Sequence, residues 1–488
     1  MADFAEIPLT EFDRGLLVRL QGKSVVKALA RQSSFQGLPR YVTEYLLAKF
    51  VKPESWKEDI AKVETRIRDL LPNPDRREMV KEKLLSTGEV TLIDQVDCRV
   101  DLKEGRRWAR VPTLDDNHVG VSQKLLEEHS GLLMGGLWGT LKVRYSPELD
   151  SSAPNELASF TPFQVGPPDM AEFRAFRSAF STADWIALML QSAGYDPAAF
   201  PTPRLKMLLL TRLIPLVERN VNLIELGPRQ TGKTFLLRNI SPRVFTISGG
   251  KTTPANLFVN LATGAIGILG SRKVVVFDEI AHTSFDTADG TISILKDFME
   301  SGQYTRGNKQ FLSDAGIFLA GNLDVLNGQP HPRYRHLFEP LPESLHDSAF
   351  HDRLHGYLPG WEIPKISPAS LANGVGFVTD YFGEALVRLR EDNHHQRFQH
   401  LQFDPGMTRR DHVAVEKLAS GYIKLLHPDG NMTREEFRAI LDMACELRQR
   451  VHDQLATLAP GEFRPKRISF KIPDEPEPQP GDRELSMP

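Results

Sequence analysis

Residues 222–240, NLIELGPRQTGKTFLLRNI, constrain the fold more than any other segment of the chain. An apolar, strand-like run leads into a loop with the pattern G-x-x-x-x-G-K-T, and an amphipathic helical run follows. In such a loop the glycines let backbone N–H groups turn toward phosphate oxygens, the lysine reaches the β- and γ-phosphates, and the hydroxyl binds Mg²⁺. A chance match in a glycine-containing turn is the alternative, and the flanking strand and helix argue against it. The pattern predicts an ATP site formed by Gly227, Pro228, Arg229, Gln230, Thr231, Gly232, Lys233 and Thr234.

Two adjacent carboxylates follow the apolar run RKVVVF further along the chain. We expect Asp278 and Glu279 at the end of a buried strand, where paired carboxylates are unfavourable unless a cation or water binds them. Asp278 is predicted to hold Mg²⁺ together with Thr234, and Glu279 to polarise the attacking water. The next apolar run, GIFLAGN, ends at Asn322, whose amide is predicted to contact the lytic water or the γ-phosphate. An asparagine that only turns the chain is the alternative.

Two arginines complete the predicted catalytic set. Arg353, in FHDRLHGYLPGWEIPK, follows a helical run, and an arginine there stabilises transition-state charge by reaching the site of a neighbouring subunit. A sensor-2 arginine is expected in the helical lid that follows: Arg410 is the first candidate, Arg409 competes with it, and an arginine in solvent at a helix start is a third interpretation. The order of P-loop, acidic pair, Asn, Arg and lid is typical of AAA+ rings, so we expect a homo-oligomer.

The pattern of elements predicts an α/β fold: an AAA+ P-loop core with a helical lid, preceded by an α+β amino-terminal region that contains a small β-barrel-like domain. A chain of 488 residues is expected to divide into several domains. The predicted division is an amino-terminal DNA-binding or assembly region at 1–145 (helical at 1–85, β-rich at 86–145), a linker at 146–168, the ATPase core at 169–363, the lid at 364–460 and a disordered tail at 461–488.

Composition excludes several classes of protein. The net charge of −3 argues against a chain coated in basic residues, so any nucleic-acid surface must be local. Two cysteines, Cys98 and Cys445, are too few for a disulfide framework or a zinc cluster. The amino terminus lacks the apolar stretch of a signal peptide, and no apolar run approaches the ~20 residues that cross a bilayer. We therefore expect a cytoplasmic protein without membrane partners.

The segment SGQYTRGNKQFLSDAG lies between the acidic pair and Asn322, where DNA-translocating AAA+ rings carry a hairpin into the channel. It places Arg306 and Lys309 on either side of a glycine turn, where cations neutralise phosphates without reading bases. A solvated polar hairpin is the alternative. Lys251, in the loop predicted after the second core strand, is another candidate for DNA contact. The hairpin lacks the aromatic tip that protein unfoldases commonly use, although Tyr304 lies on its arm.

A second candidate DNA surface lies in the predicted β-rich domain. Arg106, Arg107 and Arg110 surround Trp108 in the run RRWAR. Cations beside an indole on a small barrel suit nucleic-acid binding. A strand with one buried tryptophan and exposed arginines is the alternative.

Several runs together resemble one known family, the BrxL proteins, which are Lon-like AAA+ proteins of BREX phage-defence systems. They are GPRQTGKT, ISGGKTTPANLF, VVVFDEIAHTSF, DGTISILKDFMESGQYTRG and DSAFHDRLHGYLPGWEIPK, with RYVTEYLLAKF and LLMGGLWGTLKVRY in the amino-terminal region. The resemblance extends to about residue 465. It implies a hexameric ring that can stack into larger barrels, DNA bound in the channel, similarity to minichromosome-maintenance helicases, and other phage-defence proteins as partners. Longer members continue into a Lon-like protease domain, for which we expect no room before Pro488, so peptidase activity is not expected.

Three functions remain open at this stage. The first is an ATP-hydrolysing ring, with ATP and Mg²⁺ as cofactors, that binds DNA and translocates on it in phage defence. The second is an ATP-dependent protein remodeller that serves a separate protease. The third is an ATP-dependent scaffold that assembles on DNA without moving. The composition of the hairpin and the family resemblance favour the first.

Overall fold

A computed structural model describes residues 7–473, except for 33, 34, 36, 134, 135, 149, 165 and 286–289. The chain forms two compact units, Met1–Gly166 and Pro167–Pro488. Each unit has its own apolar core, and we describe them separately.

The first half of unit 1 is mainly helical. A capping box starts its first helix, because the Thr10 side chain accepts a bond from the Asp13 N–H while the Asp13 carboxylate accepts one from the Thr10 N–H. The last helix ends at Gly88, which has a φ of 73°. The elements are α1 (Glu11–Arg19), β1 (Ser24–Val26), α2 (Arg40–Phe50), α3 (Trp56–Leu70) and α4 (Arg77–Thr87).

A closed five-stranded barrel follows in unit 1, with the order β2-β3-β4-β6-β5. Alternate side chains of β5 are buried, as expected for a strand whose one face fills a barrel interior. The elements are β2 (Glu89–Asp101), β3 (Arg106–Val111), β4 (Asp116–Val121), α5 (Gln123–Glu128), β5 (Leu137–Tyr145) and β6 (Asn155–Pro162).

The structure corrects the predicted linker at 146–168. β6 lies inside this range, pairs antiparallel with β5 and parallel with β4, and thereby closes the barrel. Leu157 and Phe160 of β6 are buried in the barrel core. The serine- and proline-rich composition of this range predicted a linker rather than a strand. The apolar residues of β6 are recognisable as strand residues only once β5 lies beside them.

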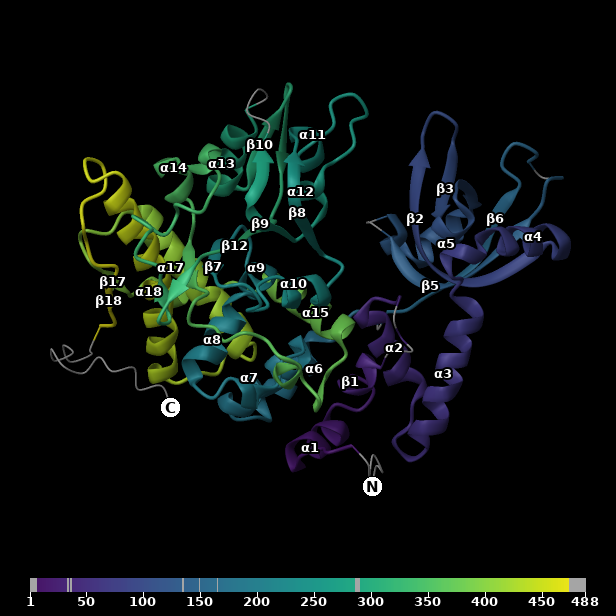
Figure 1. The fold of residues 1–488 in the computed structure, drawn as a ribbon, viewed down its shortest axis with the longest axis horizontal. Helices are drawn as coiled ribbons and strands as arrows, with labels where there is room; N and C mark the ends of the chain where they lie inside the picture. The colour runs from purple at the N-terminus through teal and green to yellow at the C-terminus, as the bar shows by residue number, and fades with distance from the viewer. Residues whose placement is uncertain are drawn as a thin grey trace. The chain divides into compact units, whose positions relative to one another are not determined.

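Unit 2 is built on a parallel five-stranded sheet with the order β15-β7-β12-β9-β8. All residues of the interior strand β7 are buried, as expected when helices cover both faces of a parallel sheet. The predicted mixed α/β fold is confirmed (Figure 1). The strands are β7 (Asn222–Gly227), β8 (Val244–Thr252), β9 (Val274–Phe285), β12 (Gly316–Asn322) and β15 (Gly356–Pro359).

Helices and short hairpins connect these strands. The helices are α6 (Met170–Ser178), α7 (Thr182–Ala193), α8 (Pro203–Thr211), α9 (Ile214–Val217), α10 (Phe235–Ile240), α11 (Pro254–Leu257), α12 (Ile268–Ser271), α13 (Thr291–Ser301), α14 (Ser348–His351), α15 (Thr379–Arg388), α16 (His395–Phe398), α17 (Arg409–Leu426) and α18 (Arg434–Leu458). The remaining strands are β10 (Gln303–Arg306), β11 (Lys309–Leu312), β13 (Val325–Leu326), β14 (Gln329–Pro330), β16 (Val375–Phe377), β17 (Gln402–Phe403) and β18 (Phe470–Lys471).

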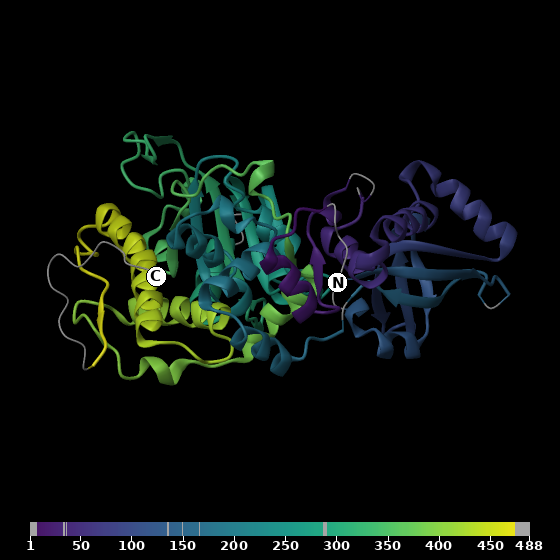
Figure 2. The same cartoon turned by 90° about the horizontal axis from the view of Figure 1, so that it is seen from below.

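The two long carboxyl-terminal helices pack against the sheet. Capping boxes begin both α17 and α18. The two helices lie side by side, and α18 packs against β15, the edge strand of the sheet (Figures 1 and 2). Val451 and Leu455 of α18 belong to the same buried cluster as Ile224 of β7 and Tyr357 of β15. The division predicted at residue 363, between core and lid, therefore does not separate two compact units.

The structure describes the first part of the tail that was predicted to be disordered. Residues 461–473 are ordered, and β18 pairs antiparallel with β17 through the partners Gln402 with Lys471 and Phe403 with Phe470. The prediction is wrong for this segment, because the strand partner comes from a distant part of the chain. Residues 474–488 lie outside the described part.

Candidate nucleotide site

The glycine-rich loop leaves the carboxyl end of β7. Gly227, the last residue of that strand, has no room for a side chain, because a Cβ there would lie 2.4 Å from the carbonyl carbon of Gly360. Gln230 and Gly232 adopt left-handed backbone angles, with φ of 68° and 69°. α10 begins directly after the loop, at Phe235. Local sequence thus produces the predicted strand, loop and helix.

Lys233 is folded back onto the loop that carries it. Its Nζ donates to the carbonyl oxygens of Gly227, at 3.0 Å, and Pro228, at 2.6 Å. Burial lowers the pKa of Lys233; the nearby Arg212 acts in the same direction, while Glu225 and Asp278 oppose it. These two hydrogen bonds would have to break for Lys233 to bind a phosphate group.

Sequence reasoning missed the ion pair beneath this loop. Arg212 and Glu225 have fully buried side chains and lie 2.7 Å apart, Nη2 to Oε1. One signal was present in the sequence: a glutamate stands inside the otherwise apolar run NLIELG. A buried carboxylate requires a charged or hydrogen-bonding partner, but the sequence did not identify which residue supplies it.

The acidic pair lies on β9, and the structure corrects its predicted place at the end of that strand. β9 continues to Phe285 beside an extended β8, which also puts Lys251 in a strand, opposite Ser284, rather than in a loop. The backbone turns locally at Glu279, which has a φ of 52°, and the register between β8 and β9 shifts at the same point. Such an irregularity re-aims a side chain within a continuing strand.

Asp278 is held by neighbouring groups. Its Oδ1 accepts a bond from the Glu279 N–H at 3.0 Å. Its Oδ2 accepts one from Arg238, on α10, at 2.8 Å, and Arg238 also donates to Ser248. The Glu279 side chain itself is exposed.

Asn322 lies between the loop and the acidic pair. β12 runs between β7 and β9, and Asn322 pairs in register with Gly227. On its other side β12 pairs with β9 through Leu319 and Phe277, so Asp278 follows at the same carboxyl edge. Two strand spacings separate β7 from β9, about 10 Å. The sheet order thus gathers the loop, the amide and the two carboxylates that the sequence predicted separately.

This set of residues fits a nucleoside triphosphate with Mg²⁺. The loop has the glycines that allow close approach of its backbone, and the lysine lies beside it. The hydroxyl of Thr234 and the carboxylate of Asp278 are oxygen ligands of the kind Mg²⁺ prefers. Bound Mg²⁺ would neutralise phosphate charge at this edge of the sheet.

Arg353 lies at the opposite end of β7 from the P-loop. Its backbone carbonyl accepts a bond from the Asn222 side chain, at the first residue of the strand. Its guanidinium pairs with Glu300 of α13, Nε to Oε2, at 2.9 Å. Arg353 therefore does not contact the P-loop of its own chain.

Arg410 lies in the same cluster. It donates to both carboxylate oxygens of Glu300, at 3.1 and 2.8 Å, and to Asp352 at 2.8 Å. Arg409, the competing candidate, is the exposed first residue of α17. The structure thus brings Arg353 and Arg410 together through Glu300, away from the nucleotide loop.

β10 and β11 form the hairpin that the sequence predicted between α13 and β12. Arg306 and Lys309 are cross-strand partners at its tip, and Gly307 turns the chain with a φ of 63°. Lys309 is exposed. Tyr304 is buried and stacks on Phe311 with ring centroids 5.4 Å apart, so the aromatic side chain supports the hairpin instead of forming a gripping tip.

In the barrel, Trp108 is buried and packs edge-on against His118, so its indole is not presented for base stacking. The arginines around it lie nearer the surface. Arg106 pairs with Asp150 and covers the Trp108 ring with its guanidinium carbon 5.3 Å from the ring centroid. Arg107 donates to Gln123 at 3.1 Å, and Arg110 lies 3.9 Å from Asp97. The observed strand matches the alternative interpretation of a buried tryptophan with exposed arginines.

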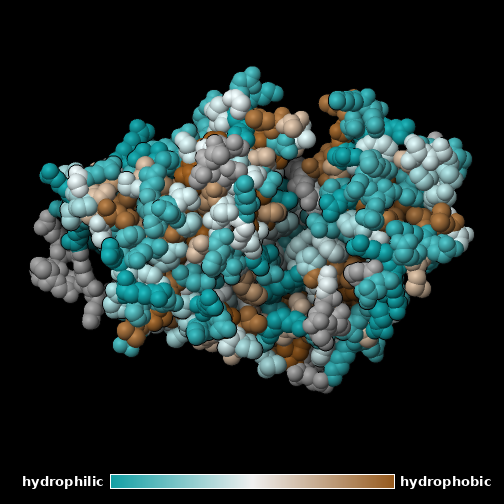
Figure 3. All heavy atoms as spheres, turned by 45° about the horizontal axis from the view of Figure 1, so that its top comes forward, coloured by the Kyte–Doolittle hydropathy of each residue, from teal (hydrophilic) through white to brown (hydrophobic). Residues whose placement is uncertain are grey.

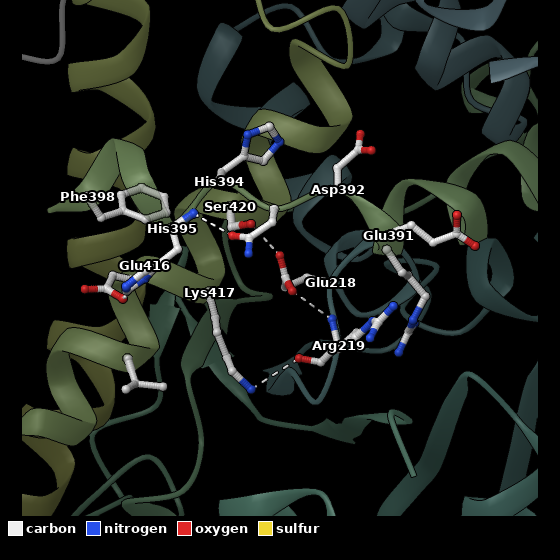
Figure 4. Close-up of a pocket in the computed structure, with 13 residues that line it drawn as sticks. Glu218, Arg219, Glu391, Asp392, His394, His395, Phe398, Glu416, Lys417 and Ser420 are labelled. Carbon is white, nitrogen blue, oxygen red and sulfur yellow. Dashed lines mark hydrogen bonds and ion pairs between the residues drawn. The ribbon is translucent and has the colours of Figure 1, made fainter. Parts of the chain in front are cut away.

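A polar cavity of about 370 Å³ lies at the amino end of β7 (Figure 4). Lys417 projects along it and donates to the backbone carbonyls of Arg219 and Asn220, and burial lowers the lysine pKa to about 8. Glu218 pairs with Lys424 at 3.0 Å. These charged groups bond to the chain itself, at the end of the strand away from the glycine-rich loop, so this cavity is separate from the nucleotide site.

No helix in the described ranges is both long and apolar enough to cross a membrane. Hydrophilic side chains cover most of the face seen in Figure 3, with smaller hydrophobic groups between them.

The parallel sheet of unit 2 belongs to an ATPase domain. Residues 156–469 match a family model described as "Lon-like protease BrxL-like, ATPase domain", and residues 19–145 match one described as "BREX system Lon protease-like protein BrxL N-terminal". The chain is 37% identical over 461 residues to the Lon-like protease BrxL of Bacillus cereus (strain H3081.97). This aligned region covers 92% of this chain and 67% of that protein. It is 34% identical over 466 residues to the protein of the same name from Escherichia coli O9:H4 (strain HS), covering 94% and 67%. The chain therefore belongs to the BrxL family, and the resemblance identified from its motifs is confirmed.

Proposed function

We propose that this protein is a ring-forming AAA+ ATPase that binds DNA and uses Mg²⁺-ATP hydrolysis to act on it in BREX-type phage defence. One observation carries the proposal. The 227–234 loop and Asn322 lie at the carboxyl ends of the adjacent strands β7 and β12, and the acidic pair lies beside them on β9, which continues to Phe285. Counted along unit 2, the sheet order is 5-1-4-3-2, which is the AAA+ arrangement.

The proposed roles follow from the geometry of this edge. Lys233 would bind the β- and γ-phosphates, and Asp278 and Thr234 would hold Mg²⁺. Arg238 donates a hydrogen bond to Asp278, and this bond would have to break for Asp278 to bind Mg²⁺. Glu279 then polarises the attacking water, and Asn322 orients it or contacts the γ-phosphate.

The distance of the two arginines from their own P-loop supports a site shared between subunits. Arg353 and Arg410 lie at the end of the sheet where β7 begins, where both pair with Glu300. In a head-to-tail ring each chain offers such a surface to the nucleotide of its neighbour. We assign Arg353 and Arg410 together to the stabilisation of charge on that neighbouring nucleotide, and a homo-oligomer, with six subunits as the expected number, to the active form.

The proposed DNA contacts lie in both units. In unit 2 they are the hairpin cations Arg306 and Lys309, with Lys251 of the extended β8. In unit 1 the barrel order β2-β3-β4-β6-β5 has the connectivity of an OB-fold, in which the second and third strands bind nucleic acid. Its second strand carries Arg106, Arg107 and Arg110. These contacts are expected to be largely independent of sequence, because they neutralise phosphates.

ATPase turnover tests the proposal most directly. It is measured for the wild type without ligand, with duplex DNA, with single-stranded DNA and with an unfolded protein. We expect stimulation by DNA, and no turnover from Lys233→Ala under any condition. Stimulation by unfolded protein alone would instead identify a protein remodeller, and equal turnover in all four conditions would identify a scaffold.

A further inference from the structure

A fully buried ion pair lies directly beneath the P-loop. Arg212 follows α8, and Glu225 stands in the middle of β7. Their side chains are joined by two parallel hydrogen bonds, Nε to Oε2 at 2.8 Å and Nη2 to Oε1 at 2.7 Å, and both are 0% exposed. Removing two charges from water is unfavourable even when they are paired, so a pair at this depth requires a reason other than stability.

The remaining donors of Arg212 explain what the pair supports. Nη2 also donates to the carbonyl oxygen of Thr231 at 3.1 Å, and Nη1 to that of Gly232 at 3.2 Å. Nη1 has a further bond, to the hydroxyl of Tyr195 at 3.4 Å, and that hydroxyl donates to the Gly232 carbonyl at 3.2 Å. The five N–H groups of the guanidinium thus make five bonds: two to the carboxylate, two to the loop and one to the tyrosine.

Bonding the two loop carbonyls fixes the direction of two loop amides. In a planar trans peptide the C=O and N–H groups point in opposite directions. Holding the Thr231 carbonyl against Arg212 therefore turns the Gly232 N–H away from it, and holding the Gly232 carbonyl does the same for the Lys233 N–H. In a loop of this pattern the amides beside the adjacent glycine and lysine are the donors that surround phosphate oxygens.

We infer that Arg212 and Glu225 are positioning residues that hold the P-loop in its phosphate-binding conformation. Arg212 anchors the carbonyl side of the loop. Glu225 orients the guanidinium, and Arg212 in turn neutralises a carboxylate that would otherwise lie uncompensated below the phosphates. This inference rests on the proposed nucleotide site.

A paired apolar replacement separates positioning from simple stabilisation. In Arg212→Met/Glu225→Met both charges leave together and similar volume remains, an exchange that often preserves stability. The loop carbonyls nevertheless lose their donors. We expect a thermal midpoint close to that of the wild type, together with a Kd for a fluorescent ATP analogue that rises about tenfold or more.

Two further variants sharpen the measurement. Arg212→Lys keeps the charge but cannot reproduce the planar fork of five donors, so its Kd is also expected to rise. Arg177→Met is the matched control, because Arg177 is buried and donates to the carbonyls of Phe180 and Leu426, in another part of unit 2. It should lower the thermal midpoint and leave the Kd unchanged.

The outcomes distinguish this inference from the proposed function. Wild-type protein that binds the analogue, beside a folded double variant that binds it equally well, would overturn the inference alone. Should the double variant not fold, a wild-type Kd in Arg212→Lys would overturn it instead. Absence of binding in the wild type, matching Lys233→Ala, would overturn the proposed site and the inference with it.

Discussion

Two inactive variants should restore activity when they are mixed, because Arg353 lies too far from its own P-loop to serve it. Asn222, beside Arg353, and Gly227, at the P-loop, are the first and last residues of β7. Five residue steps along a strand span about 17 Å, more than an extended arginine side chain reaches. Lys233→Ala removes the lysine of a chain's own site, whereas Arg353→Ala removes the arginine that the chain offers to its neighbour. Each variant alone should lose about 10³-fold or more in turnover.

Mixing creates complete sites at some interfaces. A site is complete where the P-loop of an Arg353→Ala chain faces the arginine of a Lys233→Ala chain. Random assembly of equal amounts produces this arrangement at about one quarter of the interfaces of a head-to-tail ring. Phosphate release by the mixture should therefore reach about a quarter of the wild-type rate. Mixed assembly is verified by co-purification through a tag on one variant, and co-purified rings without turnover would refute the shared site.

A second mixture tests the placement of Arg410. Arg353 and Arg410 share Glu300, so both are expected to act on the same neighbouring site. Arg353→Ala mixed with Arg410→Ala should then remain inactive, since neither chain offers both arginines. Recovery to about a quarter of the wild-type rate would show that Arg410 serves the nucleotide of its own chain.

Three further predictions follow from single contacts. Glu279→Gln should bind the ATP analogue with a wild-type Kd but lose turnover, because the water loses its base; normal phosphate release would exclude this role. Replacing Arg306 and Lys309 by Glu should weaken DNA binding on all sequences and flatten its salt dependence, measured by fluorescence anisotropy against Lys83→Glu as an exposed control; unchanged binding would move the contact elsewhere. Glu446 is half-buried, which opposes ionisation, but interactions with Arg204 and Arg450 outweigh this burial and lower its pKa from 4.5 to about 2. Its contribution to stability is therefore complete above pH 4.5 and lost as the pH falls toward 2, up to about 3 kcal/mol. Urea unfolding should show a gap between wild type and Glu446→Gln that narrows with falling pH, and a gap independent of pH would contradict the pKa shift.

Local pattern was sufficient to predict the strand, glycine-rich loop and helix that the structure contains. Gly227 and Gly232 with Lys233 are read directly, because a P-loop is a contiguous strand, turn and helix whose requirements lie within a few residues. The acidic pair and Asn322 were found for a related reason, since each polar side chain follows a buried apolar run. Even so, the sequence could not show that β9 continues past Glu279, because that continuation depends on an extended β8 beside it.

Other features depended on residues that are distant in sequence. The sequence predicts a linker where β6 lies, because β6 forms only by pairing with β4 and β5. It predicts a disordered tail where β18 lies, because β18 forms only by pairing with β17. The sequence also does not identify the partner of Glu225, although an acidic residue within an apolar strand indicates that a charged or hydrogen-bonding partner is needed. Each of these pairings depends on how separate segments pack together, which local composition and periodicity do not encode.

The sequence by itself determined the glycine-rich loop with its predicted nucleotide role, the acidic pair and a BrxL-type order of motifs. Tertiary structure alone decided how they combine. The sheet order places Asn322 between the loop and Asp278, a buried Arg212 anchors the loop from below, and Arg353 and Arg410 meet at the far end of β7. The physical reason is that residue types along a short segment specify chemistry. The distance between two groups that are separate in sequence is set instead by the order of the strands and by the pairing of buried charges.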